Sequence, residues 1–167
     1  GPPGPPGWPP PGWRLVACDV GQGDGLVVRA GTGAAVVVDT GPDPVPMRRC
    51  LDQLGVRSVP VLVLTHFHAD HVDGLAGVLA HRTVGQIWVS GLASPAHEVR
   101  AVVEAAQQRR IPVTSPGPGV RASVGDLVTV DLRRQGGLAS IAGAFGHMFA
   151  PEGRFLRIVL TPVMTHD

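Results

Sequence analysis

The segment Thr65–His71, which reads Thr-His-Phe-His-Ala-Asp-His, constrains this chain more than any other feature. Within six positions it holds four side chains of types that bind metals: His66, His68, Asp70 and His71. They follow the apolar run Pro60–Leu64, which is typical of a strand buried on both faces of a sheet. Clefts in layered α/β folds are commonly built at the carboxyl ends of such strands. We therefore expect a metal-binding loop carried by a rigid strand.

The spacing of the four side chains favours two ions. His66 and His68 are two residues apart, so in extended chain they project to the same side and can bind one ion. The chain must then turn, which lets Asp70 and His71 bind a second ion nearby. Imidazole and carboxylate ligands without thiolate suit Zn²⁺, with Mn²⁺ or Fe as alternatives. A histidine tag or a solvated histidine loop is disfavoured because neither would follow a buried strand.

The elements around this loop predict a mixed α/β layered domain. Three Val- and Leu-rich runs separated by glycine indicate a β-meander with a hairpin turn at 31–33, and alternating helices and strands follow. A helix opening at Pro42-Asp43-Pro44 should end at Gly55, and Ser94 should cap a helix with Pro95 in its first turn. The expected strands are 13–20, 25–30, 34–39, 60–64, 86–89, 111–114, 127–132 and 154–163, and the other expected helix is 72–80.

Length and composition narrow the class of protein. A chain of 167 residues with 44% hydrophobic and 16% charged residues has the size and composition of one globular domain. A net charge of +1 gives no sign of a nucleic-acid-binding balance, and the arginine pairs are typical of solvated surface. The longest apolar run, Val59–Leu64, is too short to span a bilayer, so no transmembrane segment is expected in this chain.

The two ends of the chain differ from its middle. Residues 1–12 are rich in proline and glycine and predict a stiff, extended linker. Because the chain begins Gly-Pro-Pro without an initiator Met, we expect a piece of something longer, with another segment upstream. Residues 13–132 form the predicted domain. Residues 133–167 are an unassigned tail, in which 136–149 show no clean period.

Two cysteines, Cys18 and Cys50, lie 32 residues apart without metal-type spacing. The prediction is two buried, apolar thiols, because a chain of this size does not need a disulfide to fold. The redox compartment is left open.

The loop resembles the HxHxDH signature of the metallo-β-lactamase superfamily, and Gly74 extends the match. The resemblance implies an αββα sandwich, here its N-terminal half. It also implies that His66 and His68 bind one metal, that Asp70 and His71 bind the other, and that Asp70 is catalytic because it orients the attacking water. Val36–Gly41 is similar to the preceding strand motif of that family, so Asp39 is expected to orient a ligand histidine. An ordinary strand-end cap is the alternative for Asp39.

The segment Asp19–Asp24, Asp-Val-Gly-Gln-Gly-Asp, resembles an element of ComEC-type competence proteins, the DNA-internalisation channel family. The resemblance implies DNA as the substrate and an upstream membrane channel region. The chain would then be a soluble domain of a bacterial membrane protein, on a side that is left open. Asp19, Gln22 and Asp24 are expected to contact substrate or brace the metal loop, and a glycine-rich hairpin turn is the simpler alternative.

The resemblance extends from Trp13 to about Val130. Beyond it, the chain shows neither the Gly-Asp motif nor the late His pair that the family implies, and Gly146-His147 is only faintly similar to a ligand motif of other branches. The second half of the metal site is therefore expected to be missing or replaced. Three functions remain open: a hydrolase of DNA phosphodiesters, a hydrolase of a small thioester, lactone or β-lactam, and a non-catalytic fragment that binds less metal.

Overall fold

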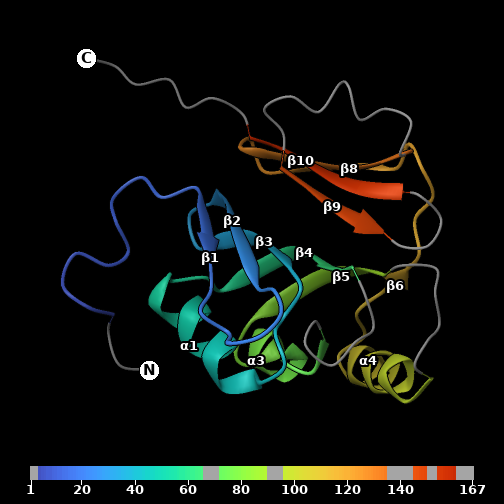
Figure 1. Ribbon diagram of the computed structural model, residues 1–167, viewed down its shortest axis with the longest axis horizontal. Coiled ribbons are helices and arrows are strands. Elements are labelled where there is room, and N and C mark those ends of the chain that lie inside the picture. The colour runs from blue at the N-terminus through green and yellow to red at the C-terminus, as the bar shows by residue number, and fades with distance from the viewer. Residues whose placement is uncertain (1–3, 66–71, 90–95, 135–144, 150–153, 161–167) are drawn as a thin grey trace.

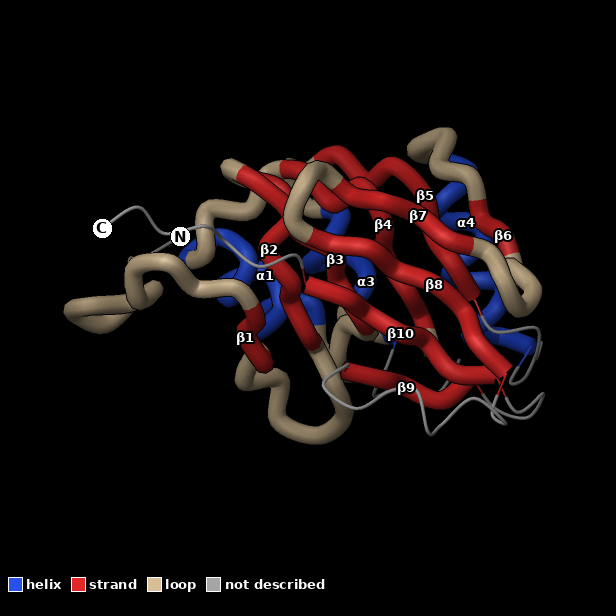
Figure 2. The backbone as a smooth tube through the Cα atoms, turned by 90° about the horizontal axis from the view of Figure 1, so that it is seen from above, coloured by secondary structure: helices blue, strands red, loops and turns tan. Residues whose placement is uncertain are grey.

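Two β-sheets and one layer of helices form the fold of the computed structural model, which describes residues 4–65, 72–89, 96–134, 145–149 and 154–160. The helices cover one face of a six-stranded sheet, and a four-stranded sheet packs on its other face (Figure 1). Seen from above, the four-stranded sheet lies across the larger one (Figure 2). This arrangement confirms the predicted α/β class.

The six-stranded sheet follows the order of the chain. It contains β1 (Leu15–Ala17), β2 (Leu26–Gly31), β3 (Ala34–Val38), β4 (Ser58–Leu64), β5 (Thr83–Val89) and β6 (Val113–Thr114). The second sheet has the order β7 (Arg121–Val124), β8 (Val128–Arg134), β10 (Arg154–Leu160) and β9 (Phe145–Phe149). The helices are α1 (Pro44–Gln53), α3 (Leu75–Leu79) and α4 (Ala96–Gln108). Strands β1 to β3 are antiparallel, and β3 to β6 are parallel.

Strand β4 is buried on both faces, as its apolar sequence predicts. Leu62 and Leu64 pack into the core between the sheet and the helices. Val61 and Val63 pack into the core between the two sheets. Because successive side chains of a strand point to opposite faces, this alternation places the end of β4 firmly between two cores.

Helix α1 begins and ends where the sequence predicts. The Asp43 side chain accepts a hydrogen bond from the Val45 amide at 2.9 Å, and Pro44 occupies the first turn. Gly55, with φ +70°, follows the last turn. Helix α3 is shorter than the predicted 72–80. A Cβ on its Gly77 would lie 2.1 Å from the Pro44 carbonyl oxygen, which shows how closely α3 approaches the start of α1.

Several strands differ from the prediction. Strand β1 has only three residues instead of the predicted 13–20, because a loop begins at Cys18. The short strands β7 and β9 were not expected, whereas β10 confirms a strand beginning at 154. Arg157 of β10 donates from Nε and Nη2 to the Asp131 carboxylate of β8, at 3.0 and 2.7 Å.

The predicted helix cap at Ser94 and Pro95 lies outside the described residues.

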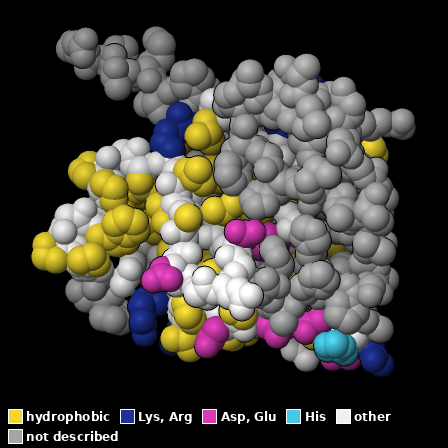
Figure 3. All heavy atoms as spheres, viewed as in Figure 1, with side chains coloured by type: hydrophobic (Ala, Val, Ile, Leu, Met, Phe, Trp, Pro, Cys, Tyr) yellow, Lys and Arg dark blue, Asp and Glu magenta, His cyan; other side chains and the backbone are white. Residues whose placement is uncertain are grey.

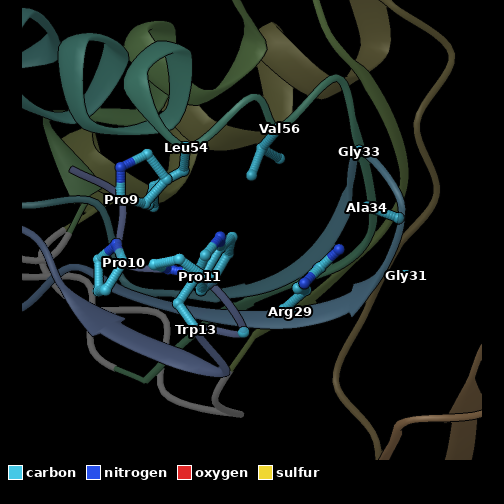
Figure 4. Close-up of a pocket in the computed structure, with 11 residues that line it drawn as sticks. Pro9, Pro10, Pro11, Trp13, Arg29, Gly31, Gly33, Ala34, Leu54 and Val56 are labelled. Carbon is cyan, nitrogen blue, oxygen red and sulfur yellow. The ribbon is translucent and has the colours of Figure 1, made fainter. Parts of the chain in front are cut away.

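The N-terminal segment is turned where an extended linker was predicted. The Trp8 amide donates to the Pro5 carbonyl at 2.9 Å, and the Trp13 amide donates to the Pro10 carbonyl at 3.3 Å. Each of these bonds closes a tight turn. Prolines 9–11 and Trp13 line a pocket of about 220 Å³ together with residues of β2 and of the chain after α1 (Figure 4). The Arg29 guanidinium lies 5.9 Å from the centre of the Trp13 ring, within range of a cation–π contact. These contacts hold the segment against the domain.

Cys18 and Cys50 form a disulfide, so the prediction of two separate thiols is wrong. Cys18 directly follows β1 and Cys50 lies in α1. The fold brings their Cα atoms to 5.9 Å from each other, within the range that a disulfide spans.

Within the part of the chain that the structure describes, no helix combines the length and apolarity needed to cross a membrane.

Candidate metal centre

The four predicted ligands, His66, His68, Asp70 and His71, lie outside the described residues, so their role as ligands remains a prediction. Among the residues that are described, no group of three or more histidine, cysteine, aspartate or glutamate side chains could hold a metal ion. The structure does describe both stems of the candidate loop, which end at Thr65 and begin again at Val72. The geometry of these stems shows how the described residues on either side of the loop are held.

Asp39 holds the first stem. Strands β3 and β4 are parallel neighbours, so Asp39 and Thr65 leave the sheet at the same edge. The Thr65 amide donates to Oδ1 of Asp39 at 2.8 Å, and the Thr65 hydroxyl donates to Oδ2 at 2.6 Å. Both residues are fully buried. Buried hydrogen bonds to a carboxylate are stronger than neutral ones, so this pair fixes the residue that precedes His66.

The backbone of Asp39 is held in an unfavourable conformation. Its φ is +60°, in the left-handed region that costs non-glycine residues free energy, although aspartate tolerates it better than most. The Asp39 amide donates to the Val63 carbonyl at 2.8 Å, and its carboxylate is bound to Thr65. These bonds outweigh the local cost. Strain of this kind is concentrated at functional sites.

The second stem is held by the residues that follow Asp39. The Gly74 amide donates to the Gly41 carbonyl at 2.8 Å. A Cβ on Gly74 would lie 2.0 Å from the Thr40 carbonyl oxygen, which is closer than any side chain can approach. Segment 39–41 therefore contacts both stems of the candidate loop, Thr65 on one side and Gly74 on the other.

Gly74→Ala is expected to lower the free energy of unfolding by about 1–3 kcal/mol, because its Cβ would displace the backbone at Thr40. Urea denaturation measures this loss. Gly31→Ala is the control, since its Cβ would meet nothing within 4 Å; it should change the free energy by no more than about 0.5 kcal/mol. Equal effects for the two variants would contradict the close contact at Gly74.

The loop containing residues 19–24 lies against the same segment. Val20 is buried, and its side chain lies so close to Gly41 that a Cβ there would be 2.6 Å from Val20 Cβ. The Asp24 carbonyl accepts a hydrogen bond from the Gly41 amide at 2.9 Å. The side chains of Asp19 and Gln22 are exposed. The structure thus brings this loop beside segment 39–41, while the roles of Asp19, Gln22 and Asp24 toward substrate remain predictions.

A pair of carboxyl groups lies just beyond the second stem. Glu98, in the first turn of α4, is buried, and a hydrogen bond with Asp73 raises its pKa, with burial acting in the same direction. Nε2 of His97 lies 3.3 Å from Oε1 of Glu98 and acts against this rise in pKa.

The candidate loop suits a divalent metal by its donor set. Three imidazoles and a carboxylate favour Zn²⁺, and the buried Asp39 carboxylate at the root of the loop is the kind of group that holds ligands in place. Sequence reasoning missed the roles of Thr65 and Gly41. The available signals were a hydroxyl residue directly before His66 and a glycine directly after the Asp-Thr pair.

The class of protein that these observations define is a layered α/β domain in which Thr65 and Gly74, on either side of the candidate loop, are anchored at the ends of parallel strands. The chain belongs to the metallo-beta-lactamase superfamily, whose sequence model matches residues 18–155. The match continues past residue 132 and reaches into β10. No curated protein matches the chain.

Three similar solved structures are all metallo-β-lactamases. One from Pontibacter korlensis is 22% identical with a TM-score of 0.46, and the match covers 68% of this chain and 49% of the Pontibacter chain. A HARLDQ-motif mutant from Cronobacter sakazakii is 15% identical with a TM-score of 0.49, covering 81% and 51%. One from Hirschia baltica is 16% identical with a TM-score of 0.41, covering 84% and 58%. The chain therefore spans about half the length of these structures.

Proposed function

We propose that this chain is the metal-dependent hydrolase domain of a ComEC-type DNA-internalisation protein and acts on DNA phosphodiesters. The observation that carries the hydrolase part is the anchoring of both stems of the 66–71 loop on segment 39–41. Membership of the metallo-beta-lactamase superfamily supports it, since that superfamily consists largely of hydrolases. The Asp19–Asp24 element supports the competence-type branch and its DNA substrate.

The proposed roles follow the order of the chain. His66 and His68 hold one divalent ion, Asp70 and His71 hold the second, and zinc suits this set best, with manganese or iron as alternatives. Two such ions would supply an activated water and stabilise charge on the attacking and leaving oxygens. Asp70 orients the water, and Asp39 keeps the loop in place through Thr65. Asp19, Gln22 and Asp24 lie on the loop proposed to face substrate.

The proposed context is a domain attached to an upstream membrane channel region of a bacterial protein. The Cys18–Cys50 disulfide supports a position on the oxidising side of the membrane, because disulfides persist in such compartments. The domain boundaries proposed from the sequence, a linker to residue 12, a domain to 132 and a tail from 133, belong to the same hypothesis.

The proposal is tested by the cleavage of single-stranded DNA in the presence of Mn²⁺ or Zn²⁺. His68→Ala is expected to lower the rate by about 100-fold or more, because it removes a metal ligand. His81→Asn is the matched control: it removes an exposed imidazole outside the loop, and asparagine tolerates the positive φ of that position. Equal rates of DNA cleavage by the wild-type chain and by His68→Ala would contradict the proposal.

Metal content separates the remaining alternatives. Elemental analysis should find close to two ions in each wild-type chain. Finding one ion or none in each chain would show that residues 66–71 belong to an incomplete centre in a non-catalytic fragment. Two ions without DNA cleavage, but with hydrolysis of a thioester, lactone or β-lactam, would keep the metal centre and replace the substrate.

A further inference from the structure

The disulfide joins the start of the 19–24 loop to helix α1. Cys18 is the residue immediately before this loop, and Cys50 lies in the last turns of the helix. At its other end the loop is held by the bond from the Gly41 amide to the Asp24 carbonyl. The loop is thus fixed covalently on one side and by hydrogen bonding and packing on the other.

A surface pocket of about 500 Å³ borders the disulfide. Its walls include Pro5 and Trp8 of the N-terminal segment and Arg49 of α1. Trp8 is 38% exposed, and hydrophobic side chains gather over the N-terminal segment at the left of Figure 3. Cys50 is partly exposed and Cys18 is buried. Cys50 is therefore the more accessible of the two bonded residues to a molecule in this pocket.

A continuous set of contacts connects this disulfide to the candidate metal loop. Val20, two residues after Cys18, packs on Gly41, and the Gly41 carbonyl accepts the amide of Gly74. Releasing Cys18 from α1 removes one of the constraints that press Val20 onto Gly41. The second stem of the 66–71 loop depends on the same glycine.

We propose that Cys18–Cys50 is a thiol–disulfide exchange site for a dithiol, and that its reduction loosens the 19–24 loop and the stem at Gly74. A thiolate of the dithiol attacks Sγ of Cys50, the Cys50–Cys18 bond breaks, and Cys18 leaves as a thiolate that takes up a proton. The second thiol of the partner then attacks the mixed disulfide and releases Cys50. Two electrons pass from the dithiol to the cystine, and the partner becomes a disulfide. Exchange at this site does not require hydrolase activity.

The first test measures reduction of the full chain by dithiothreitol, with alkylation of the released thiols and mass spectrometry. Direct attack through the pocket predicts a rate that is first order in dithiothreitol and almost unchanged by low, non-denaturing urea. Trp8→Ala removes part of the pocket wall and should raise the rate several-fold. The proposal would be overturned if the rate of reduction followed the urea dependence of global unfolding and were the same in Trp8→Ala as in the wild-type chain.

The second test compares hydrogen exchange of the oxidised and reduced chains. Amides in 19–25, together with those of Gly41 and Gly74, should exchange roughly tenfold faster after reduction, while those of β4 stay protected. A double variant, Cys18→Ser with Cys50→Ser, should show the reduced pattern and no response to dithiothreitol. Uniform acceleration across both sheets would show a structural disulfide only, and no change at Gly41 and Gly74 would show that the loop is not coupled to it. Either result overturns the proposal.

Discussion

Arg82→Met is expected to lower the free energy of unfolding by about 3–5 kcal/mol, because it removes a buried guanidinium that donates several hydrogen bonds to buried carbonyl groups. The Arg82 side chain is 1% exposed and donates from Nη2 to the Asp52 carboxylate of α1. Burial lowers the pKa of Arg82 below its ordinary value, and the neighbouring Asp52 opposes part of this change. The guanidinium still stays charged near neutral pH, because arginine titrates far above it.

The same guanidinium also satisfies four backbone carbonyl groups. It donates to Val56 and Gly77, both at 2.9 Å, to Ala80 at 2.9 Å and to Arg48 at 3.3 Å. Methionine fills a similar space but donates to none of them, so these carbonyl groups at α1, at α3 and at residue 56 would lose their guanidinium donor. The loss is therefore expected to be among the largest for a single substitution in this chain.

Urea denaturation checks this result through the midpoint, with the slope unchanged. Arg100→Met is the control, because Arg100 is exposed on α4; it should change the free energy by no more than about 0.5 kcal/mol. Arg82→Lys keeps the charge but not the planar set of donors, so an intermediate loss is expected. A loss below about 1 kcal/mol for Arg82→Met would show that water replaces the guanidinium.

Asp39→Ala is expected to weaken metal binding by about 10- to 100-fold, because it removes the carboxylate that holds the stem of the candidate loop. It also leaves the buried Thr65 amide without that acceptor, at a cost of about 1–3 kcal/mol in stability. Zinc affinity, measured by competition with a chromophoric chelator, reports the first effect, and urea denaturation reports the second.

Three matched variants separate the carboxylate from the backbone conformation. Asp39→Asn tolerates the positive φ of this position and keeps one acceptor for the Thr65 amide, so it should lose metal affinity with little loss of stability. Thr65→Ser keeps the hydroxyl and should resemble the wild-type chain, whereas Thr65→Val should resemble Asp39→Asn. Unchanged zinc affinity in Asp39→Ala would remove Asp39 from the metal centre.

The parts of the fold that the sequence predicted well depend on local signals. Strand β4 was recognisable because an apolar run of strand length must be buried on both sides. Helix α1 was recognisable by Asp43 and Pro44 at its start and Gly55 after its end. The α/β class followed from the alternation of such elements, and the family followed from the HxHxDH pattern.

The parts that were missed depend on residues distant in the sequence. The disulfide needs β1 and α1 to lie side by side, which the spacing of Cys18 and Cys50 alone does not indicate. The hydrogen bonds between Asp39 and Thr65 join positions 26 residues apart, and they exist only because β3 and β4 are parallel neighbours. Strand β7 is a four-residue segment without an apolar run, and it becomes a strand by pairing with β8.

The order of the larger sheet has a consequence for synthesis of the protein. Because β1 to β6 are neighbours in the order in which they are translated, the segments framing the candidate centre emerge from the ribosome before β7 to β10. During that interval the face of the sheet carrying Val36, Val38 and Val63 lacks its later cover. The nascent chain thus passes through a stage with an exposed apolar surface, which is where a chaperone would be most useful.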